Sequence, residues 1–335
     1  MNESATILSL DDLRVDFDTR EGPVHAVRGV SWSLAAGQTL AVVGESGSGK
    51  SVSALAVLGL IPRPPGRIAG GRIVYRGQDI LEMDAGELRR LRGNRIAMIF
   101  QEPMTSLNPV LRIGEQIAEG LRVHQGLDRP AARQRALDML RLVQIPEPER
   151  RLDAWPHELS GGMRQRVMIA LALACGPDVL IADEPTTALD VTIQAQILDV
   201  LRDIKTHLGT SIVLITHDLG VVAEMADRVV VLYAGQVVEE GPVRAVLRRP
   251  THPYTLGLLG ARPELSSRST GPRRTRLTEI PGTVPSLREP IIGCAFAPRC
   301  ALASARWRAE APVLEARDAG QRSACWHADQ METPA

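Results

Sequence analysis

The stretch that decides the fold of this 335-residue chain is Gly44-Glu45-Ser46-Gly47-Ser48-Gly49-Lys50-Ser51. It fits the phosphate-binding pattern GxxxxGK[ST], follows an apolar run at Leu40–Val43 and opens a helical pattern at Ser51–Leu60. The glycines let backbone N–H groups turn towards an anion. We expect Lys50 to reach the β- and γ-phosphates of a nucleotide and Ser51 to ligate Mg²⁺. The residues expected to bind the nucleotide here are Gly44, Ser46, Gly47, Gly49, Lys50 and Ser51.

Outward from this loop, short β-branched runs alternate with helical patterns. We expect strands at Leu40–Val43, Ile96–Phe100, Val179–Asp183, Ile212–Thr216 and Val229–Tyr233. Buried parallel strands that carry functional loops at their carboxyl ends have this appearance.

Between residues 103 and 173 the patterns are helical, as at Arg133–Val143 and Met163–Ala174, which predicts an inserted helical subdomain. The expected fold class is α/β: a P-loop NTPase core with a mixed sheet, the inserted helical subdomain and a small irregular C-terminal domain.

Two acidic residues end the strand expected at Val179–Asp183. Asp183 would hold Mg²⁺ or its water shell, and Glu184 would polarise the water that attacks the γ-phosphate. Two acids can also form an ordinary strand exit. The phosphate-binding loop upstream favours the catalytic interpretation.

A second anion site is indicated at Ser160-Gly161-Gly162, before a helical pattern. Ser160 is a natural N-cap, and the glycines leave N–H groups exposed at the positive end of the helix dipole. The alternative is a plain capped helix.

Together these elements resemble the ATP-binding subunit of ABC transporters. Leu159-Ser160-Gly161-Gly162-Met163 resembles the LSGGQ signature of that family, which acts on the ATP of a partner subunit. The resemblance implies that Gln101 links Mg²⁺ and the attacking water to the membrane partner and that His217 contacts the γ-phosphate. It also implies that Phe17 stacks on adenine and that Asp190 lies in a loop crossing the dimer interface. The implied catalytic residues are Glu184, His217 and Gln101, and the implied Mg²⁺ ligands are Ser51, Gln101 and Asp183.

The composition changes near residue 250, and ten of the 23 prolines lie from Pro250 onward. HPYT at 252–255, IPGTVPSL at 280–287 and the Cys294 to Cys300 segment resemble the C-terminal extension of oligopeptide, dipeptide and nickel importers. We therefore expect an ABC ATPase domain at 1–250, with its helical subdomain at about 103–173, and an importer-type extension at 251–335.

In that branch the extension carries four cysteines suited to an iron–sulfur cluster. Cys294, Cys300 and Cys325 match three positions, but Trp307 occupies the remaining one and offers no ligand atom. Three outcomes stay open: no metal, a cluster held by three cysteines and another ligand such as His327, or a different metal such as zinc. We expect cofactors ATP and Mg²⁺, with the cluster doubtful, and we expect the extension to fold by apolar packing of Phe296, Leu302, Trp307, Val313 and Leu314.

The resemblance implies an ATP-hydrolysing subunit that powers import of di- or oligopeptides. It implies a second ABC ATPase chain, as a heterodimer, two permease membrane subunits and an extracytoplasmic peptide-binding protein. The chain would then act as a peripheral protein at the cytoplasmic face of the inner cell membrane. The alternatives are a nickel importer ATPase, a nucleic-acid- or ribosome-associated ABC ATPase, and a non-catalytic regulatory subunit.

Composition bears on these alternatives. Lys plus Arg and Asp plus Glu both number 39, so the net charge is zero, which argues against nucleic-acid binding through general positive charge. The sequence shows one phosphate-binding loop and no heptad array. Lys50, Asp183, Glu184 and His217 are all present, which argues against a non-catalytic subunit.

No run of 18 apolar residues predicts a membrane span, and the first residues do not resemble a secretory signal.

Overall fold

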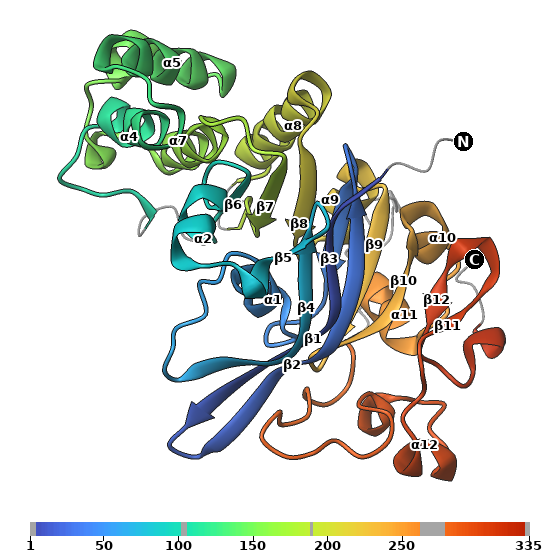
Figure 1. Cartoon of the computed structure of the whole chain (residues 1–335). Helices are drawn as coiled ribbons and strands as arrows, with labels where there is room; N and C mark the ends of the chain where they lie inside the picture. The colour runs from blue at the N-terminus through green and yellow to red at the C-terminus, as the bar shows by residue number, and fades with distance from the viewer. Residues whose placement is uncertain (1–4, 102–105, 188–189, 262–278, 332–335) are drawn as a thin grey trace, which may run out of the picture.

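Two β-sheets and the helices that cover them build the molecule (Figure 1). The computed structural model describes residues 5–101, 106–187, 190–261 and 279–331. The strands are β1 (Thr6–Thr19), β2 (Gly22–Ala35), β3 (Thr39–Val43), β4 (Gly66–Tyr75), β5 (Gln78–Asp79), β6 (Ile96–Ile99), β7 (Val179–Asp183), β8 (Ser211–Ile215), β9 (Arg228–Tyr233), β10 (Gln236–Pro242), β11 (Glu315–Ala316) and β12 (Arg322–Ser323). The larger sheet has the order β11-β12-β10-β9-β3-β8-β7-β6, and the smaller has the order β2-β1-β4-β5.

Five buried strands form the parallel centre of the larger sheet, at the positions that the β-branched runs predict. β3 pairs in parallel with β8 and β9, and β7 pairs in parallel with β6 and β8. Continuous apolar runs suit such strands because helices or a second sheet cover both of their faces. β10 runs antiparallel to β9, so the sheet is mixed. The predicted α/β class with a mixed sheet is confirmed.

The smaller, antiparallel sheet was not anticipated from the sequence. β1 pairs with both β2 and β4, and its register shifts at several points. The side chains of Leu8, Leu10 and Leu13 are fully buried in a core that also contains Leu40 and Val42 of β3. This sheet therefore covers the strand that leads into the phosphate-binding loop.

Helices make up the other regular elements of the described chain. The α-helices are α1 (Lys50–Val57), α2 (Ala85–Leu91), α4 (Ile113–Gln125), α5 (Arg129–Leu142), α6 (Pro148–Arg151), α7 (Gly161–Leu173), α8 (Val191–Leu208), α9 (Leu219–Met225), α10 (Val243–Arg248), α11 (Pro253–Gly260) and α12 (Ala305–Ala309). Short 3-10 turns lie at Ile80–Glu82, Pro156–Glu158, Ala297–Arg299, Asp318–Gly320 and Ala328–Gln330.

The helical subdomain lies beyond the β6 end of the larger sheet, where α4, α5 and α7 pack on one another (Figure 1). From residue 106 to residue 173 the described residues contain helices and no strand, as the sequence predicts for this insertion. Their buried side chains form one cluster with residues of β6, β7 and β8. The subdomain is therefore packed directly against the sheet.

The described residues after 250 pack on the body of the molecule. β12 pairs with β10 and β11 pairs with β12, so they lengthen the larger sheet at its edge. Phe296 joins a buried cluster with Tyr233 of β9 and Tyr254 of α11. The extension thus completes a core that the body begins.

Two of the five residues expected to form an apolar core in the extension lie at the surface instead. Phe296 and Trp307 are buried and Leu314 is half-buried, but Leu302 is 42% exposed and Val313 is 64% exposed. The prediction is wrong for Leu302 and Val313, which belong neither to the buried cluster around Phe296 nor to the residues that line the cavity beside Trp307.

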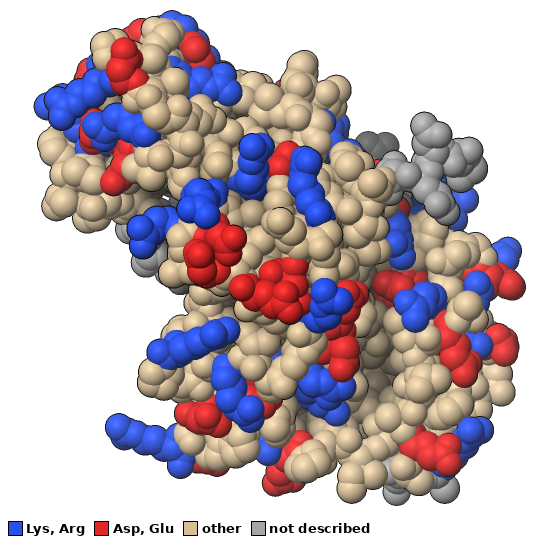
Figure 2. Space-filling view, viewed as in Figure 1, with Lys and Arg blue, Asp and Glu red and all other residues tan. Residues whose placement is uncertain are grey.

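None of the helices in the described ranges has the length and apolar character needed to cross a membrane. Basic and acidic side chains are interspersed over the face shown in Figure 2, in keeping with the zero net charge of the chain.

Candidate nucleotide site

The phosphate-binding loop lies between β3 and α1, as its sequence pattern predicts. A Cβ on Gly44 would lie 2.2 Å from the carbonyl oxygen of Leu232. Gly49 has φ +98°, and a Cβ there would lie 2.7 Å from the carbonyl oxygen of Ala26. Only glycine fits positions with such close backbone neighbours and such a conformation. The neighbouring strands therefore fix the path of the loop at both ends.

The ammonium group of Lys50 lies inside this loop. Its Nζ donates to the carbonyl oxygens of Gly44 at 2.7 Å and Glu45 at 3.0 Å. Burial lowers the pKa of Lys50, while the carboxylates of Glu184, Asp183 and Glu45 oppose that effect. A buried positive charge at the first turn of a helix is suited to binding phosphate oxygens.

Ser51 and Asp183 meet although they are far apart in the sequence. Ser51 Oγ donates to Asp183 Oδ1 at 3.1 Å. Asp183 ends β7 and is buried, and burial raises the pKa of its carboxyl, whereas the hydrogen bond from Ser51 and the charge of Lys50 act in the opposite direction. A hydroxyl and a carboxylate beside the phosphate-binding loop fit the oxygen ligands of a phosphate-bound Mg²⁺.

Three side chains surround the carboxylate of Glu184. Gln101 Nε2 donates to Oε2 at 3.3 Å, Thr187 Oγ1 donates to the same oxygen at 2.8 Å, and His217 Nδ1 lies 3.4 Å from Oε1. Glu184 has φ +47°, a conformation that non-glycine residues rarely adopt and that is frequent at functional sites. Its N–H donates to the carbonyl of Ile215 at 2.9 Å. The structure thus brings together the three residues predicted for catalysis, and it adds Thr187, which the sequence reasoning missed.

The predicted signature segment forms the start of α7. Ser160 is the N-cap, and its Oγ accepts a hydrogen bond from the N–H of Met163 at 3.3 Å. Ser160 and the following Gly161 are exposed, and Gly162 is half-buried. Gln165 on the same helix donates to the carbonyl of Pro185 at 2.7 Å. This second contact was not predicted, and it ties α7 to the residue that follows Glu184.

Asp190 caps a helix, and Phe17 lies on a strand of the smaller sheet. The carboxylate of Asp190 caps α8 by accepting a hydrogen bond from the N–H of Ile193 at 2.9 Å. The two residues before Asp190 lie outside the described ranges. Phe17 is half-buried on β1, and its Cε1 lies 3.0 Å from where a Cβ on Gly66 would be. Their roles at the dimer interface and at adenine remain predictions.

The C-terminal extension reaches the phosphate-binding loop, which the sequence reasoning did not foresee. The N–H of Glu45 donates to Tyr254 Oη at 2.7 Å, and both Nη atoms of Arg299 donate to the Glu45 carboxylate, at 2.6 and 3.0 Å. His252 caps α11, because its Nδ1 accepts a hydrogen bond from the N–H of Tyr254 at 3.1 Å. The HPYT motif at 252–255, which resembles the importer extension, contributes Tyr254 to this contact.

The cysteines of the extension line one small cavity of about 10 Å³, together with Trp307. Burial raises the pKa of Cys294 and Cys300, and it raises that of Cys325 to about 11. Trp307 is buried, and its carbonyl accepts a hydrogen bond from the N–H of Cys294 at 2.8 Å.

The residues around this cavity do not fit a four-thiolate iron–sulfur cluster. Trp307, which occupies the sequence position of the fourth cysteine, lines the cavity and offers no ligand atom, and a cavity of this size holds at most about one water molecule. The ring of His327 packs against Trp307 with centroids 4.5 Å apart, and its buried Nδ1 has no hydrogen-bond partner. Across the described residues, no group of three or more His, Cys, Asp or Glu side chains is arranged to hold a metal ion.

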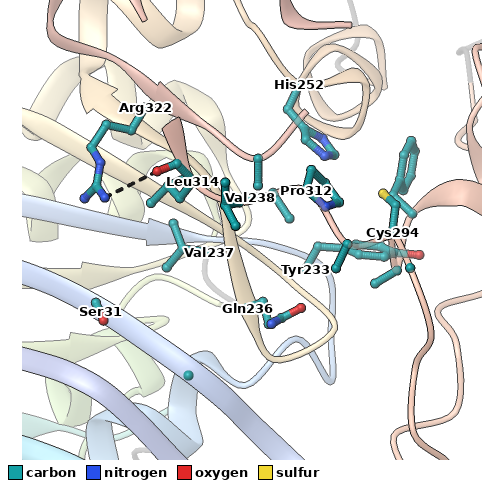
Figure 3. Close-up of a pocket in the computed structure, with 17 residues that line it drawn as sticks. Ser31, Tyr233, Gln236, Val237, Val238, His252, Cys294, Pro312, Leu314 and Arg322 are labelled. Atoms are coloured by element: carbon teal, nitrogen blue, oxygen red, sulfur yellow. Dashed lines mark hydrogen bonds between the residues drawn. The ribbon is translucent and has the colours of Figure 1, made fainter. Parts of the chain in front are cut away.

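An open pocket of about 360 Å³ separates the body from part of the extension (Figure 3). Gln236, Val237 and Val238 of β10 form one side, and Cys294 and Arg322 of the extension contribute to its lining. No residue of the phosphate-binding loop lines this pocket. It belongs to the contact between body and extension rather than to the nucleotide site.

Known proteins with similar sequences share both parts of this chain. Residues 27–187 match the family described as "ABC transporter", and residues 238–306 match "Oligopeptide/dipeptide transporter, C-terminal region". A probable peptide ABC transporter ATP-binding protein of Sinorhizobium fredii is 52% identical over 325 residues, which cover 97% of this chain and 96% of the relative. The oligopeptide transport ATP-binding protein OppD of Bacillus subtilis is 51% identical over 313 residues (93% and 86%). The dipeptide transport ATP-binding protein DppD of Escherichia coli is 50% identical over 319 residues (95% and 96%).

Solved structures give the same answer for the fold. A bacterial ABC transporter cassette determined as a dimer has a TM-score of 0.64 and 29% identity, and it covers 71% of this chain and 99% of its own. The same cassette in a post-hydrolysis state, bound to ADP and Pi, matches with the same values. These likenesses confirm the resemblance noted in the sequence and the use of a nucleotide. The chain belongs to the ATP-hydrolysing, ATP-binding subunits of ABC transporters, in the branch that carries the oligopeptide/dipeptide C-terminal region.

Proposed function

We propose that this chain hydrolyses ATP to power the import of di- or oligopeptides through a membrane complex. The observation that carries the proposal is the position of the Glu184 carboxylate, between Gln101 and His217 and directly after the Ser51–Asp183 pair. The peptide-transport names of the relatives support the choice of cargo. Nickel is the alternative cargo to be distinguished.

In the proposed mechanism the loop residues 44–51 bind the phosphates through backbone N–H groups and the ammonium of Lys50. Ser51, Asp183 and Gln101 would hold Mg²⁺, which when bound neutralises charge on the phosphate oxygens. Glu184 accepts a proton from the attacking water, and the hydrogen bonds that its Oε2 accepts from Gln101 and Thr187 hold the carboxylate in position for this step.

Two further residues would complete the nucleotide contacts. His217 donates to the γ-phosphate, and Phe17 stacks on the adenine ring. Thr187 keeps the Glu184 carboxylate in place through its hydroxyl hydrogen bond.

We infer that the exposed start of α7 serves ATP held by a second ABC ATPase subunit. The helix N-terminus at Ser160, Gly161 and Gly162 leaves its first N–H groups facing outward, where they can bind an anion from outside the chain. Asp190 would lie in the loop at that interface. The partner would be a related but different chain, which makes the ATPase pair a heterodimer.

The remaining partners would be two permease membrane subunits and an extracytoplasmic peptide-binding protein. The relatives named as ATP-binding proteins of peptide transport support these partners. This chain would be peripheral at the cytoplasmic face of the inner membrane, and Gln101 would pass the motion of the ATP site to the permease. No nucleic-acid partner is proposed.

Transport by the purified complex in vesicles tests the proposal. ATP-dependent uptake of labelled dipeptides and longer peptides is expected, and ATP turnover is expected to rise with loaded binding protein. Uptake of Ni²⁺ in place of peptides would overturn the cargo assignment. Turnover stimulated by RNA or DNA and indifferent to binding protein would overturn the transport function.

A further inference from the structure

Glu45, the second residue of the phosphate-binding loop, is held on two sides by the C-terminal extension. Its N–H donates to the hydroxyl of Tyr254, and its carboxylate accepts two hydrogen bonds from Arg299. A carboxylate that meets a guanidinium through two parallel hydrogen bonds is fixed in direction as well as in position. The first turn of the loop therefore depends on residues more than 200 positions away.

Arg299 is built into a site that uses most of its donors. Its side chain is 4% exposed, whereas that of Glu45 is 29% exposed. Besides Glu45, the guanidinium donates to the carbonyls of Pro281 and Ile280, at 2.9 and 3.2 Å, and to Tyr233 Oη at 3.4 Å. The hydrogen bonds to Glu45 raise the pKa of Arg299, so the group is charged at every relevant pH. Because these contacts hold the guanidinium in place, its two hydrogen bonds to Glu45 fix the position of that carboxylate.

Tyr254 is equally constrained. It is fully buried, and its ring packs against Tyr233 and Phe296 with centroid distances of 4.6 and 5.5 Å. This packing holds the ring in place, and the hydroxyl oxygen accepts a hydrogen bond from the N–H of Glu45.

Both polar groups of the Glu45 backbone are thus held by hydrogen bonds. Its N–H donates to the hydroxyl of Tyr254, and its carbonyl accepts a hydrogen bond from Lys50 Nζ at 3.0 Å. We propose that Arg299 and Tyr254 are positioning residues for ATP binding, through which the C-terminal extension holds the phosphate-binding loop in its binding shape. This inference rests on the assignment of the loop to ATP in the proposed function, and it is independent of the cargo.

Binding of an ATP analogue with a fluorescent ribose label to the full chain tests the inference. Arg299→Met leaves the Glu45 carboxylate without its partner and is expected to raise the Kd about tenfold. Tyr254→Phe removes a single hydroxyl and is expected to raise the Kd about fourfold. Arg299→Lys keeps the charge and one donor, so it should recover part of the affinity lost in Arg299→Met. In the assembled complex, KM for ATP should rise while kcat stays within about twofold.

The matched control is Arg322→Met. Arg322 also joins the extension to the body, through a 3.0 Å ion pair with Glu240, but it does not contact the loop. It should leave the Kd within about twofold of the wild-type value. An equal loss of affinity in Arg322→Met and Arg299→Met would overturn the inference, because the extension would then act through overall stability.

Two further results separate the inference from the site on which it rests. Unchanged affinity in both Arg299→Met and Tyr254→Phe, together with loss of binding in Lys50→Met, would overturn the inference alone. Normal binding in Lys50→Met would overturn the assignment of the ATP site and the inference with it. Should Arg299→Met fail to fold, the conservative Tyr254→Phe, with its melting temperature measured alongside, decides the question.

Discussion

The position of Glu184 is determined both by its sequence neighbours and by side chains from elsewhere in the chain. Its place after Asp183 is set by the chain, but its carboxylate is oriented by Gln101, Thr187 and His217, which come from three other positions. The backbone of Glu184 has a positive φ and is held by a hydrogen bond to Ile215. A side chain supported in this way has little freedom to leave the position where water would attack.

Replacing Glu184 by Gln should separate ATP binding from hydrolysis. The amide keeps the size and hydrogen bonding of the carboxylate but accepts no proton, so turnover should fall by roughly 10²–10⁴ while the Kd for ATP stays near the wild-type value. Steady-state turnover of the assembled complex measures this. A decrease smaller than about threefold would show that another group acts as the base.

The residues of the site differ in how far the sequence alone could predict them. Lys50, Ser51 and Asp183 belong to patterns with short, fixed spacing. Their residue types and sequence neighbours were therefore sufficient to predict them as site residues. Thr187 lies only three residues after Glu184 but belongs to no pattern that was recognised. Arg299 could not be predicted, because its contact with Glu45 spans 254 positions and depends on how the extension packs.

Among the elements, α11 depends on an uncharged His252 at its N-cap. Complete burial lowers the pKa of His252 to about 3 from its ordinary value of 6.5. Above the ordinary value neither the folded nor the unfolded chain binds this proton. Between the two values only the unfolded chain binds it, so the free energy of unfolding decreases as the pH falls.

His252→Asn should remove this part of the pH dependence. Asn keeps an oxygen that can cap the helix and does not titrate. The stability of the wild type relative to the variant should therefore fall by about 1.4 kcal/mol for each pH unit below the ordinary histidine pKa. Denaturant unfolding of both proteins at neutral and at mildly acidic pH measures this, and parallel losses in the two proteins would contradict it.

The cysteine-lined part of the extension should contain no iron–sulfur cluster. Trp307 supplies no ligand atom, and it fills the space beside Cys294. Protein purified without oxygen is therefore expected to be colourless and to contain little iron, as measured by absorbance and metal analysis. A brown sample with near-stoichiometric iron that disappears in Cys300→Ser would show that the three thiols recruit a further ligand.

The strands show where sequence patterns are informative. The five parallel strands are continuous apolar runs, and all five were predicted. In β1 the register shifts between Leu10 and Leu13 and again beyond, which breaks the alternation expected of a half-buried strand. β11 and β12 have two residues each, and their existence depends on pairing at the β10 edge. The antiparallel parts of the fold therefore follow from tertiary packing.

At the scale of the whole molecule, the proposed complex would use the phosphate-binding loop for the ATP of this chain and the exposed start of α7 for the ATP of the partner. The first contains Lys50 and has the Ser51–Asp183 pair beside it, whereas Ser160 lies exposed at the end of a helix. A complete catalytic centre in the proposed complex therefore requires two chains.

Ser160→Arg should block hydrolysis of the partner's nucleotide and spare ATP binding at Lys50 of this chain. The larger side chain would occupy the space where a γ-phosphate meets the helix N-terminus. Photolabelling each subunit with an ATP analogue, combined with turnover measurements, tests this. Ser160→Thr keeps the capping oxygen and is the control. Loss of labelling on this chain alone would contradict the arrangement in trans.

The contacts of Glu45 also impose an order in time. Glu45 precedes Tyr254 and Arg299 by 209 and 254 residues in the chain. Since chains begin to fold while they are being made, the phosphate-binding loop is synthesised before either partner exists. A product that stops before residue 254 carries the whole phosphate-binding motif and lacks both side chains that contact Glu45. The contacts between Glu45 and the extension can therefore form only after residue 299 has been synthesised.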